Sequence, residues 1–127
     1  MSILNENGFI LLHDLNPLLD KYQTPEEPAY PIWIWNGDCW KAAIAIQLIQ
    51  ELELVVGDFD HGVGILRRRP NQHPLPKEWA DRVFAHMAAN PSPESFLESI
   101  SFAEFSQNRE VLYRMMTVAE VKAWLEE

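Results

Sequence analysis

Two long stretches of the chain space their hydrophobic residues as a helix does. Between residues 38 and 53, Trp40, Ile44 and Leu48 recur every four positions, and alanines and isoleucines between them widen the apolar surface. A helix that is apolar over most of its circumference is usually buried, so we expect this one at the centre of the core. Residues 77–90 carry a narrower apolar stripe and predict a second, amphipathic helix.

Shorter apolar runs predict strands. Residues 8–13 (GFILLH) fit one strand, and residues 32–35 (IWIW) fit a short buried one. Between residues 54 and 69 two apolar runs flank a turn rich in glycine and aspartate, which predicts a β-hairpin. The segments 24–31 and 70–76 are rich in proline and are expected to be connections, because proline disrupts helices and central strands.

The remaining segments carry helix-start signals. Asn-Pro at 16–17 and Ser-Pro at 92–93 place a capping residue before a proline at the first helical position. Residues 101–104 and 117–120 match the capping box, in which a hydroxyl and a carboxylate each bind a free backbone N–H. The expected fold is therefore α+β. We predict a mostly helical single globular domain over residues 1–127, with a small sheet or hairpin in the first half and a helical C-terminal half.

The composition adds exclusions to this picture. The chain has 127 residues, 47% hydrophobic and 23% charged, which is ordinary for a globular domain. Its single cysteine, Cys39, cannot form an internal disulfide or a thiolate zinc site, and we expect it in or near the core. No apolar run approaches the roughly 18 residues of a membrane span. We expect a cytoplasmic protein without a signal peptide.

The charge is strongly and unevenly negative. The net charge is −9, which disfavours nucleic acid and anionic membranes as partners and favours a basic protein. Residues 1–60 hold ten acidic and two basic residues, whereas residues 61–90 hold two acidic and five basic ones. The basic residues include the run Arg67–Arg69. We expect these arginines to pair with the protein's own carboxylates; a small phosphate site is the alternative.

The segment Asp58-Phe59-Asp60-His61 is the most suggestive cluster for chemistry. Two carboxylates and an imidazole in a loop flanked by glycine could hold a metal ion. The EF-hand pattern fails, because its sixth and twelfth positions would be Val63 and Arg69 rather than glycine and glutamate. Aspartate and glycine are ordinary turn residues, so we interpret the segment as a hairpin turn and predict no metal and no cofactor.

Other candidate residues are weaker. His13-Asp14 could orient an imidazole for base chemistry, but no nucleophile can be placed near it. The sequence contains no glycine-rich phosphate loop, no GxSxG and no HExxH motif. We therefore predict no catalytic residues and expect the protein not to be an enzyme.

Five tryptophans complete the picture. Trp40, Trp79 and Trp124 lie on helical stripes and are expected in the core, whereas Trp33 and Trp35 would share one face of an extended segment. Several acidic residues lie near Trp33 and Trp35 in the sequence. A binder of a basic protein would present an edge of this kind, both acidic and aromatic. The predicted partner-binding residues are Glu26, Glu27, Trp33, Trp35, Asp38, Asp58 and Asp60.

These observations lead to one preferred hypothesis and two alternatives. The preferred one is a protein-binding module, most specifically an inhibitor or immunity-type protein that neutralises a basic toxin or enzyme. The first alternative is a subunit of a larger assembly or a homodimer built on the edge of Trp33 and Trp35. The second is a small metal-dependent enzyme that uses Asp58, Asp60 and His61, with His13 as a further candidate.

Overall fold

A four-stranded sheet organises the protein. The computed structural model describes residues 4–5, 7–26, 35–92 and 95–127. The strand order is β1-β3-β2-β4; β1 and β2 both pair with β3 in antiparallel fashion, and β4 pairs with β2 in parallel. The strands are β1 (Phe9–Leu12), β2 (Leu52–Gly57), β3 (Val63–Arg68) and β4 (Met115–Met116).

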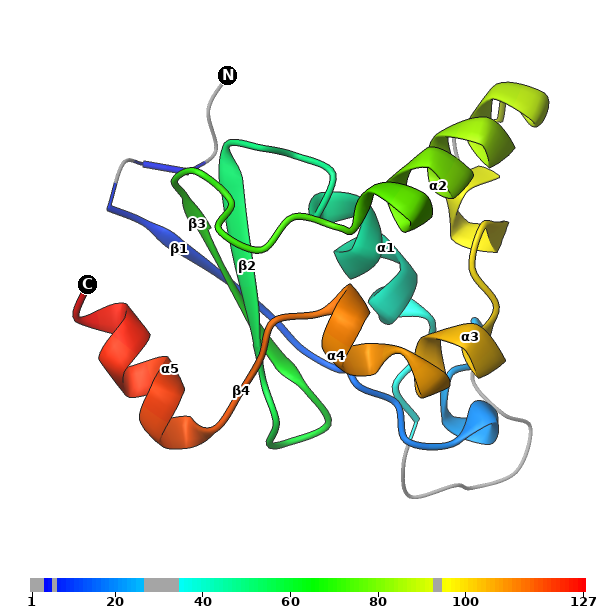
Figure 1. The fold of residues 1–127 in the computed structure, drawn as a ribbon. Helices are drawn as coiled ribbons and strands as arrows, with labels where there is room; N and C mark the ends of the chain where they lie inside the picture. Colours follow the sequence, from blue (N-terminus) through cyan, green and yellow to red (C-terminus); the bar gives the residue numbers. More distant parts are fainter. Residues whose placement is uncertain (1–3, 6, 27–34, 93–94) are drawn as a thin grey trace.

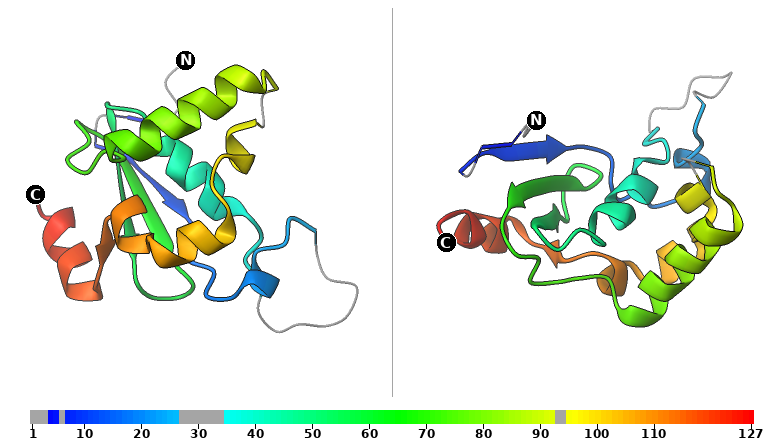
Figure 2. Two further views of the ribbon diagram at one scale, coloured as in Figure 1. Left: turned by 45° about the vertical axis from the view of Figure 1, so that its right-hand side comes forward. Right: turned by 90° about the horizontal axis from the view of Figure 1, so that it is seen from above.

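Helices cover both faces of this sheet. Figures 1 and 2 show α5 (Val118–Leu125) on one side of the strands and the other helices on the opposite side. The helices on that opposite side are α1 (Cys39–Ile46), α2 (Lys77–Ala89), α3 (Phe102–Gln107) and α4 (Arg109–Leu112), with the 3-10 helices η1 (Asp20–Tyr22) and η2 (Ser95–Glu98).

The hydrophobic core therefore lies in two layers. The larger layer packs Leu54, Val56 and Leu66 of the sheet against Trp40 of α1 and the helices around it. There the ring of Trp40 stacks on Phe105 with 4.4 Å between centroids. The smaller layer packs the alternate strand positions, such as Val55 and Ile65, against Val121 and Trp124 of α5. Because β2 and β3 are buried on both faces, their central residues 54–56 and 65–66 are apolar without alternation.

Several predicted elements are confirmed. The first strand, the hairpin of β2 and β3 and the helix α2 occur where the sequence indicates them. Both capping boxes form, with Ser101 and Thr117 accepting from the backbone N–H of Glu104 and Glu120. Trp40 and Trp124 are fully buried, and Trp79 packs partly buried against the core.

Other predictions need correction. The first long helix ends at Ile46, and its expected last turn, with Leu52 and Glu53, belongs to β2 instead. The predicted helix after Asn16-Pro17 is only the 3-10 turn Asp20–Tyr22, because Asn16 is buried and its backbone N–H donates to His61 O at 2.8 Å. The C-terminal part is not purely helical, since β4 joins the sheet.

The fold is thus a mixed α+β arrangement rather than a mostly helical one. Helices hold 40% and strands 16% of the described residues, so helix is the larger class without being a majority. Residues 32–34 of the strand expected at residues 32–35 lie outside the described residues, and Trp35 lies in no strand. None of the helices in the described part of the chain combines the length and apolar character needed to cross a bilayer.

Candidate functional site

The segment after β1 and the turn between β2 and β3 meet at one end of the sheet, the lower end in Figure 1. The backbone N–H of Leu15 donates to Gly62 O at 3.0 Å, and that of Asn16 donates to His61 O at 2.8 Å. Gly62 has φ of +89°, and a Cβ there would lie 2.5 Å from the backbone nitrogen of Asn16. Only glycine fits both the backbone conformation and the close approach, so this contact is built into the hairpin turn.

This contact brings together two histidine–aspartate motifs that are separate in the sequence. His13 Nε2 lies 3.1 Å from Asp60 Oδ2, and His13 Nδ1 lies 3.1 Å from Asp14 Oδ2. All three side chains remain partly exposed. The hydrogen bond to Asp60, and then that to Asp14, raises the pKa of His13 above its ordinary value. The two carboxylates therefore favour the protonated form of the imidazole.

Backbone strain concentrates in the same two segments. Asp14, Asp60 and His61 have φ values of 62°, 46° and 60°, and they are the only non-glycine residues of the described chain with positive φ. This region costs energy for residues with a Cβ, and such strain persists only where surrounding contacts impose it. Strained residues are often found at functional sites, which makes this end of the sheet the first place to look for one.

A third segment extends the surface. Asn36 Nδ2 donates to Asp14 Oδ1 at 2.7 Å, and Asn36 N donates to Tyr22 O at 2.7 Å. Trp35 Nε1 donates to Thr24 O at 2.9 Å, which fixes an indole that is 40% exposed. We call the resulting surface the acidic end and define it by its exposed and half-buried members. These are Asp14, Asp38, Asp58 and Asp60, together with His13 and Trp35.

The structure describes five of the seven predicted binding residues. Asp58 and Asp60 project from the hairpin turn, Trp35 and Asp38 lie in the third segment, and Glu26 is exposed beside it. Glu27 and Trp33 lie outside the described residues. Sequence reasoning did not place Asp14 on this surface, although the pairing with Asp60 through His13 makes it central.

Two cations reduce the negative charge of the acidic end. Lys41 Nζ lies 3.6 Å from Asp38 Oδ2, one helical turn away. The guanidinium of Arg109 is hydrogen-bonded to Asn16 Oδ1 and lies near enough to Asp58 to interact electrostatically. His13 adds a third positive group when protonated. Asp60 nevertheless keeps a side chain that is 69% exposed, and Asp58 is exposed as well.

The acidic end differs from the metal site considered as an alternative. Among the described residues, no group of three or more His, Cys, Asp or Glu side chains is arranged to hold a metal ion. Cys39, expected in or near the core, is exposed at the first residue of α1. Partial desolvation, with Asp38 and Asp14 nearby, raises the pKa of its thiol, which disfavours a reactive thiolate.

The basic run was predicted to pair with the protein's own carboxylates, and two of its members do so. Arg67 and Arg69 both reach the carboxylate of Glu53, which is fully buried. Arg114 Nη1 donates to Glu53 Oε1 at 2.8 Å, and Trp124 Nε1 donates to Glu53 Oε2 at 3.1 Å. We name this group of Glu53, Arg67, Arg69, Arg114 and Trp124 the Glu53 cluster.

The sequence analysis missed the Glu53 cluster because it placed Glu53 in a helix. The available signal was the two-residue spacing of the strand. It places Glu53 on the same face of β2 as Val55, and Arg67 on the same face of β3 as Ile65, so both charges lie on one face of the sheet.

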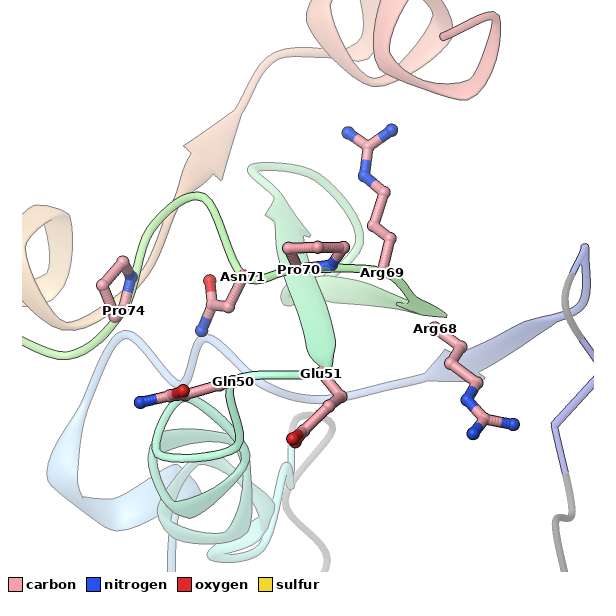
Figure 3. Close-up of a pocket in the computed structure, with 7 residues that line it drawn as sticks. All are labelled: Gln50, Glu51, Arg68, Arg69, Pro70, Asn71 and Pro74. Carbon is pink, nitrogen blue, oxygen red and sulfur yellow. The ribbon is translucent and has the colours of Figure 1, made fainter.

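One pocket lies away from the acidic end. It has a volume of about 610 Å³ and lies beside Pro70 and Pro74, between the start of β2 and the end of β3. Figure 3 shows that Arg68 and Arg69 direct their guanidinium groups to different sides of it rather than toward one point. A binding site needs convergent polar groups, so we do not base the function on this pocket.

No family model matches the chain, and neither a curated protein nor a solved structure matches it significantly.

Proposed function

We propose that the protein is a binding module for a basic protein, of the inhibitor or immunity type, and that the acidic end is its contact surface. The proposal rests on one observation: two strained segments and the region around Trp35 are fixed together so that Asp14, Asp38, Asp58 and Asp60 lie on one end of the molecule. Strained backbone that presents exposed carboxylates is typical of a preorganised interface rather than of a tolerant surface loop.

The charge distribution supports this choice of partner. Arg67, Arg69 and Arg114 face the buried carboxylate of Glu53, so much of the basic run is neutralised internally. The net charge of −9 is then expressed mainly on the outer surface. Charge of one sign on a binding surface steers an oppositely charged partner and raises its association rate by about 10- to 1000-fold at low salt.

Trp35 supplies the apolar part of such a contact. Its ring is 40% exposed, yet its indole N–H is already satisfied by Thr24 O, so the ring can be buried by a partner without leaving a polar group unpaired. Tryptophan is among the residues that contribute most to protein–protein binding energy. An exposed, fixed indole beside carboxylates suits a partner surface rich in lysine or arginine, which can also stack on it.

The first experiment is affinity capture from the native host at about 50 mM and 500 mM salt, with association rates then measured for the captured protein. The test variant is Asp58→Asn/Asp60→Asn. The control is Glu51→Gln/Glu78→Gln, which removes the same charge from exposed positions elsewhere. We expect a basic protein to be retained at low salt, and the test variant to slow association about tenfold while the control slows it less than about twofold. Capture of no basic protein at low salt, or equal effects of both variants, would contradict the proposal.

A further inference from the structure

A second pocket lies at the other end of β3 from the acidic end. It has a volume of about 380 Å³ and is enclosed by the start of β1, the end of β3 and the end of α5. Its lining joins Phe9 and Leu125 to Arg67, Arg69 and Glu127. A volume of this size is within the range of small-molecule sites, which combine an apolar wall with a few polar groups that fix orientation.

The carboxylate of Glu127 occupies the polar part of this pocket incompletely. Its Oε2 atom lies 2.8 Å from Arg69 Nη2 but 3.6 Å from Arg67 Nη2, so one oxygen is shared between two guanidinium groups and only one hydrogen bond forms. The Glu127 side chain is 55% exposed. It can therefore turn outward into water at little cost and leave both guanidinium groups to another anion.

One nitrogen of the Arg67 guanidinium group is positioned to bind such an anion. The residue is only 9% exposed, and its Nη2 is buried without a hydrogen-bond partner among the described residues. Burial, and then the neighbouring Arg69, lowers the pKa of Arg67, as expected for a cation whose charge is not fully balanced. Among the described residues, the guanidinium groups of Arg67, Arg69 and Arg114 share the two carboxylates of Glu53 and Glu127.

The apolar part of the pocket is also incompletely covered. Phe9 is 46% exposed and Leu125 is 41% exposed. Phe9 packs at an angle against Trp124 with 6.4 Å between ring centroids, and the Cζ atom of Arg67 lies 3.7 Å from the centroid of that indole. A flat apolar group against Phe9 and Leu125 would thus continue an existing row of stacked side chains next to the guanidinium group of Arg67.

We propose that this pocket binds a small monocarboxylate with an apolar or aromatic body. The carboxylate displaces that of Glu127 and places one oxygen on Arg69 Nη2 and the other on Arg67 Nη2. This satisfies the buried nitrogen that Glu127 leaves unpaired. The body of the ligand packs on Phe9 and Leu125. Glu127 acts as a placeholder, so its removal strengthens binding.

The test uses four probes with the whole chain: phenylacetate, its neutral analogue phenylacetamide, acetate, and inorganic phosphate. Chemical-shift titrations with 15N-labelled protein give the affinity and map the site. We expect phenylacetate to bind with a Kd on the order of 1 mM and to perturb Phe9, Leu125 and the indole N–H of Trp124. Phenylacetamide should bind at least about tenfold more weakly because it lacks the charge, and acetate equally so because it lacks the apolar body.

Two charge-removing variants distinguish the displacement of Glu127 by the ligand from a general effect of negative charge on binding. Glu127→Gln should tighten phenylacetate binding by about three- to tenfold, because the competing carboxylate is gone. The control Glu126→Gln removes the same charge from the neighbouring exposed position and should change affinity less than about twofold. Neither variant touches Glu53, so the fold is kept. Leu125→Ser should weaken binding, whereas Val118→Ser, at the other end of α5, should not.

Three outcomes would overturn the proposal. The first is equal binding of phenylacetate and phenylacetamide, which would show that the arginines do not recognise the carboxylate. The second is equal affinity of the Glu127→Gln and Glu126→Gln variants, which would show that Glu127 is not in the site. The third is stronger binding of inorganic phosphate than of phenylacetate at this pocket, which would assign it to phosphate rather than to apolar carboxylates.

Discussion

The indole Nε1 of Trp124 donates a hydrogen bond to the buried carboxylate of Glu53 at 3.1 Å, although 71 residues separate them in the chain. Glu53 lies in the first half of β2 and Trp124 near the end of α5. Arg67 stacks over the same indole with 3.7 Å between its Cζ atom and the ring centroid. The contact therefore fixes α5 on the sheet through a buried charge. Such a charge would be unstable in a purely hydrophobic core.

Removal of the Glu53 charge should destabilise the protein strongly. In Glu53→Gln the volume is kept, but three arginines lose the carboxylate that they share, and breaking a buried ion pair costs about 3–5 kcal/mol. Urea unfolding monitored by tryptophan fluorescence measures the change. The control Glu51→Gln, exposed two residues earlier, should change the free energy of unfolding by less than about 0.5 kcal/mol. A loss below about 1 kcal/mol for Glu53→Gln would show that the cluster is not stabilising as described.

The capping box at the start of α5 gives a second prediction. Thr117 Oγ1 accepts from Glu120 N at 3.3 Å, and the Glu120 carboxylate accepts from Thr117 N at 2.7 Å. Thr117→Ala should lower the free energy of unfolding by about 1 kcal/mol, because backbone N–H groups lose their partner. Thr117→Ser keeps the hydroxyl and should cost less than about 0.5 kcal/mol. Equal losses in both variants would point to the lost methyl group rather than to the cap.

The close contact in the hairpin turn predicts unequal costs for two glycine substitutions. Gly37→Ala should cost about 1–2 kcal/mol for its φ of +65° alone, because the nearest atom of the described residues to a new Cβ is 4.0 Å away. Gly62→Ala adds a collision with Asn16 and should exceed that cost by at least about 1 kcal/mol. Chemical unfolding of both variants compares the two values. Similar costs would mean that the segment after β1 moves away without penalty.

The bridge from His13 to Asp60 and Asp14 predicts a pH dependence of stability. A raised pKa in the folded state means that the protonated imidazole stabilises the fold fully below the unfolded value of 6.5. The stabilisation is lost as the pH rises through the folded value. Because these groups are largely exposed, we expect less than about 1 kcal/mol. The advantage of wild type over His13→Gln should therefore be largest below about pH 6.5 and shrink as the pH rises above that value.

Proton NMR titration of His13 measures this pKa directly. The pKa should lie above 6.5 in the wild type and fall in Asp60→Asn, since the hydrogen bond to Asp60 is the largest cause of the shift. Glu78→Gln, on the exposed side of α2, is the control and should leave the titration unchanged. A wild-type pKa at or below 6.5 would contradict the bridge.

Local chemistry was predictable wherever near neighbours decide the structure. The capping boxes, the stripe of α2 and the apolar runs of β2 and β3 were recognised because their signals lie within a few residues of one another. The end of α1 was placed too late, because the apolar spacing continues through Leu52 while the chain already turns into β2. There the tertiary pairing with β3 overrides helical spacing.

The candidate site was only partly predictable for the same reason. Asp58, Asp60 and Trp35 were recognised as exposed binding candidates from their residue types. The bridge between His13 and Asp60 spans 47 positions, and no local pattern indicates it. It depends on the backbone contact of Asn16 with the turn of the hairpin, which forms only when β1 pairs with β3.

The acidic balance, the hairpin, the caps and the tryptophans that form the core follow from the amino-acid sequence, because composition and short-range spacing are properties of the chain. That both faces of the sheet are covered, that Glu53 lies beneath α5 and that the basic run turns partly inward follows only from the assembled fold. This difference arises because burying a charge requires partners from distant segments. Glu53 draws its partners from β3, from the segment before β4 and from α5, and they meet only after the sheet has assembled.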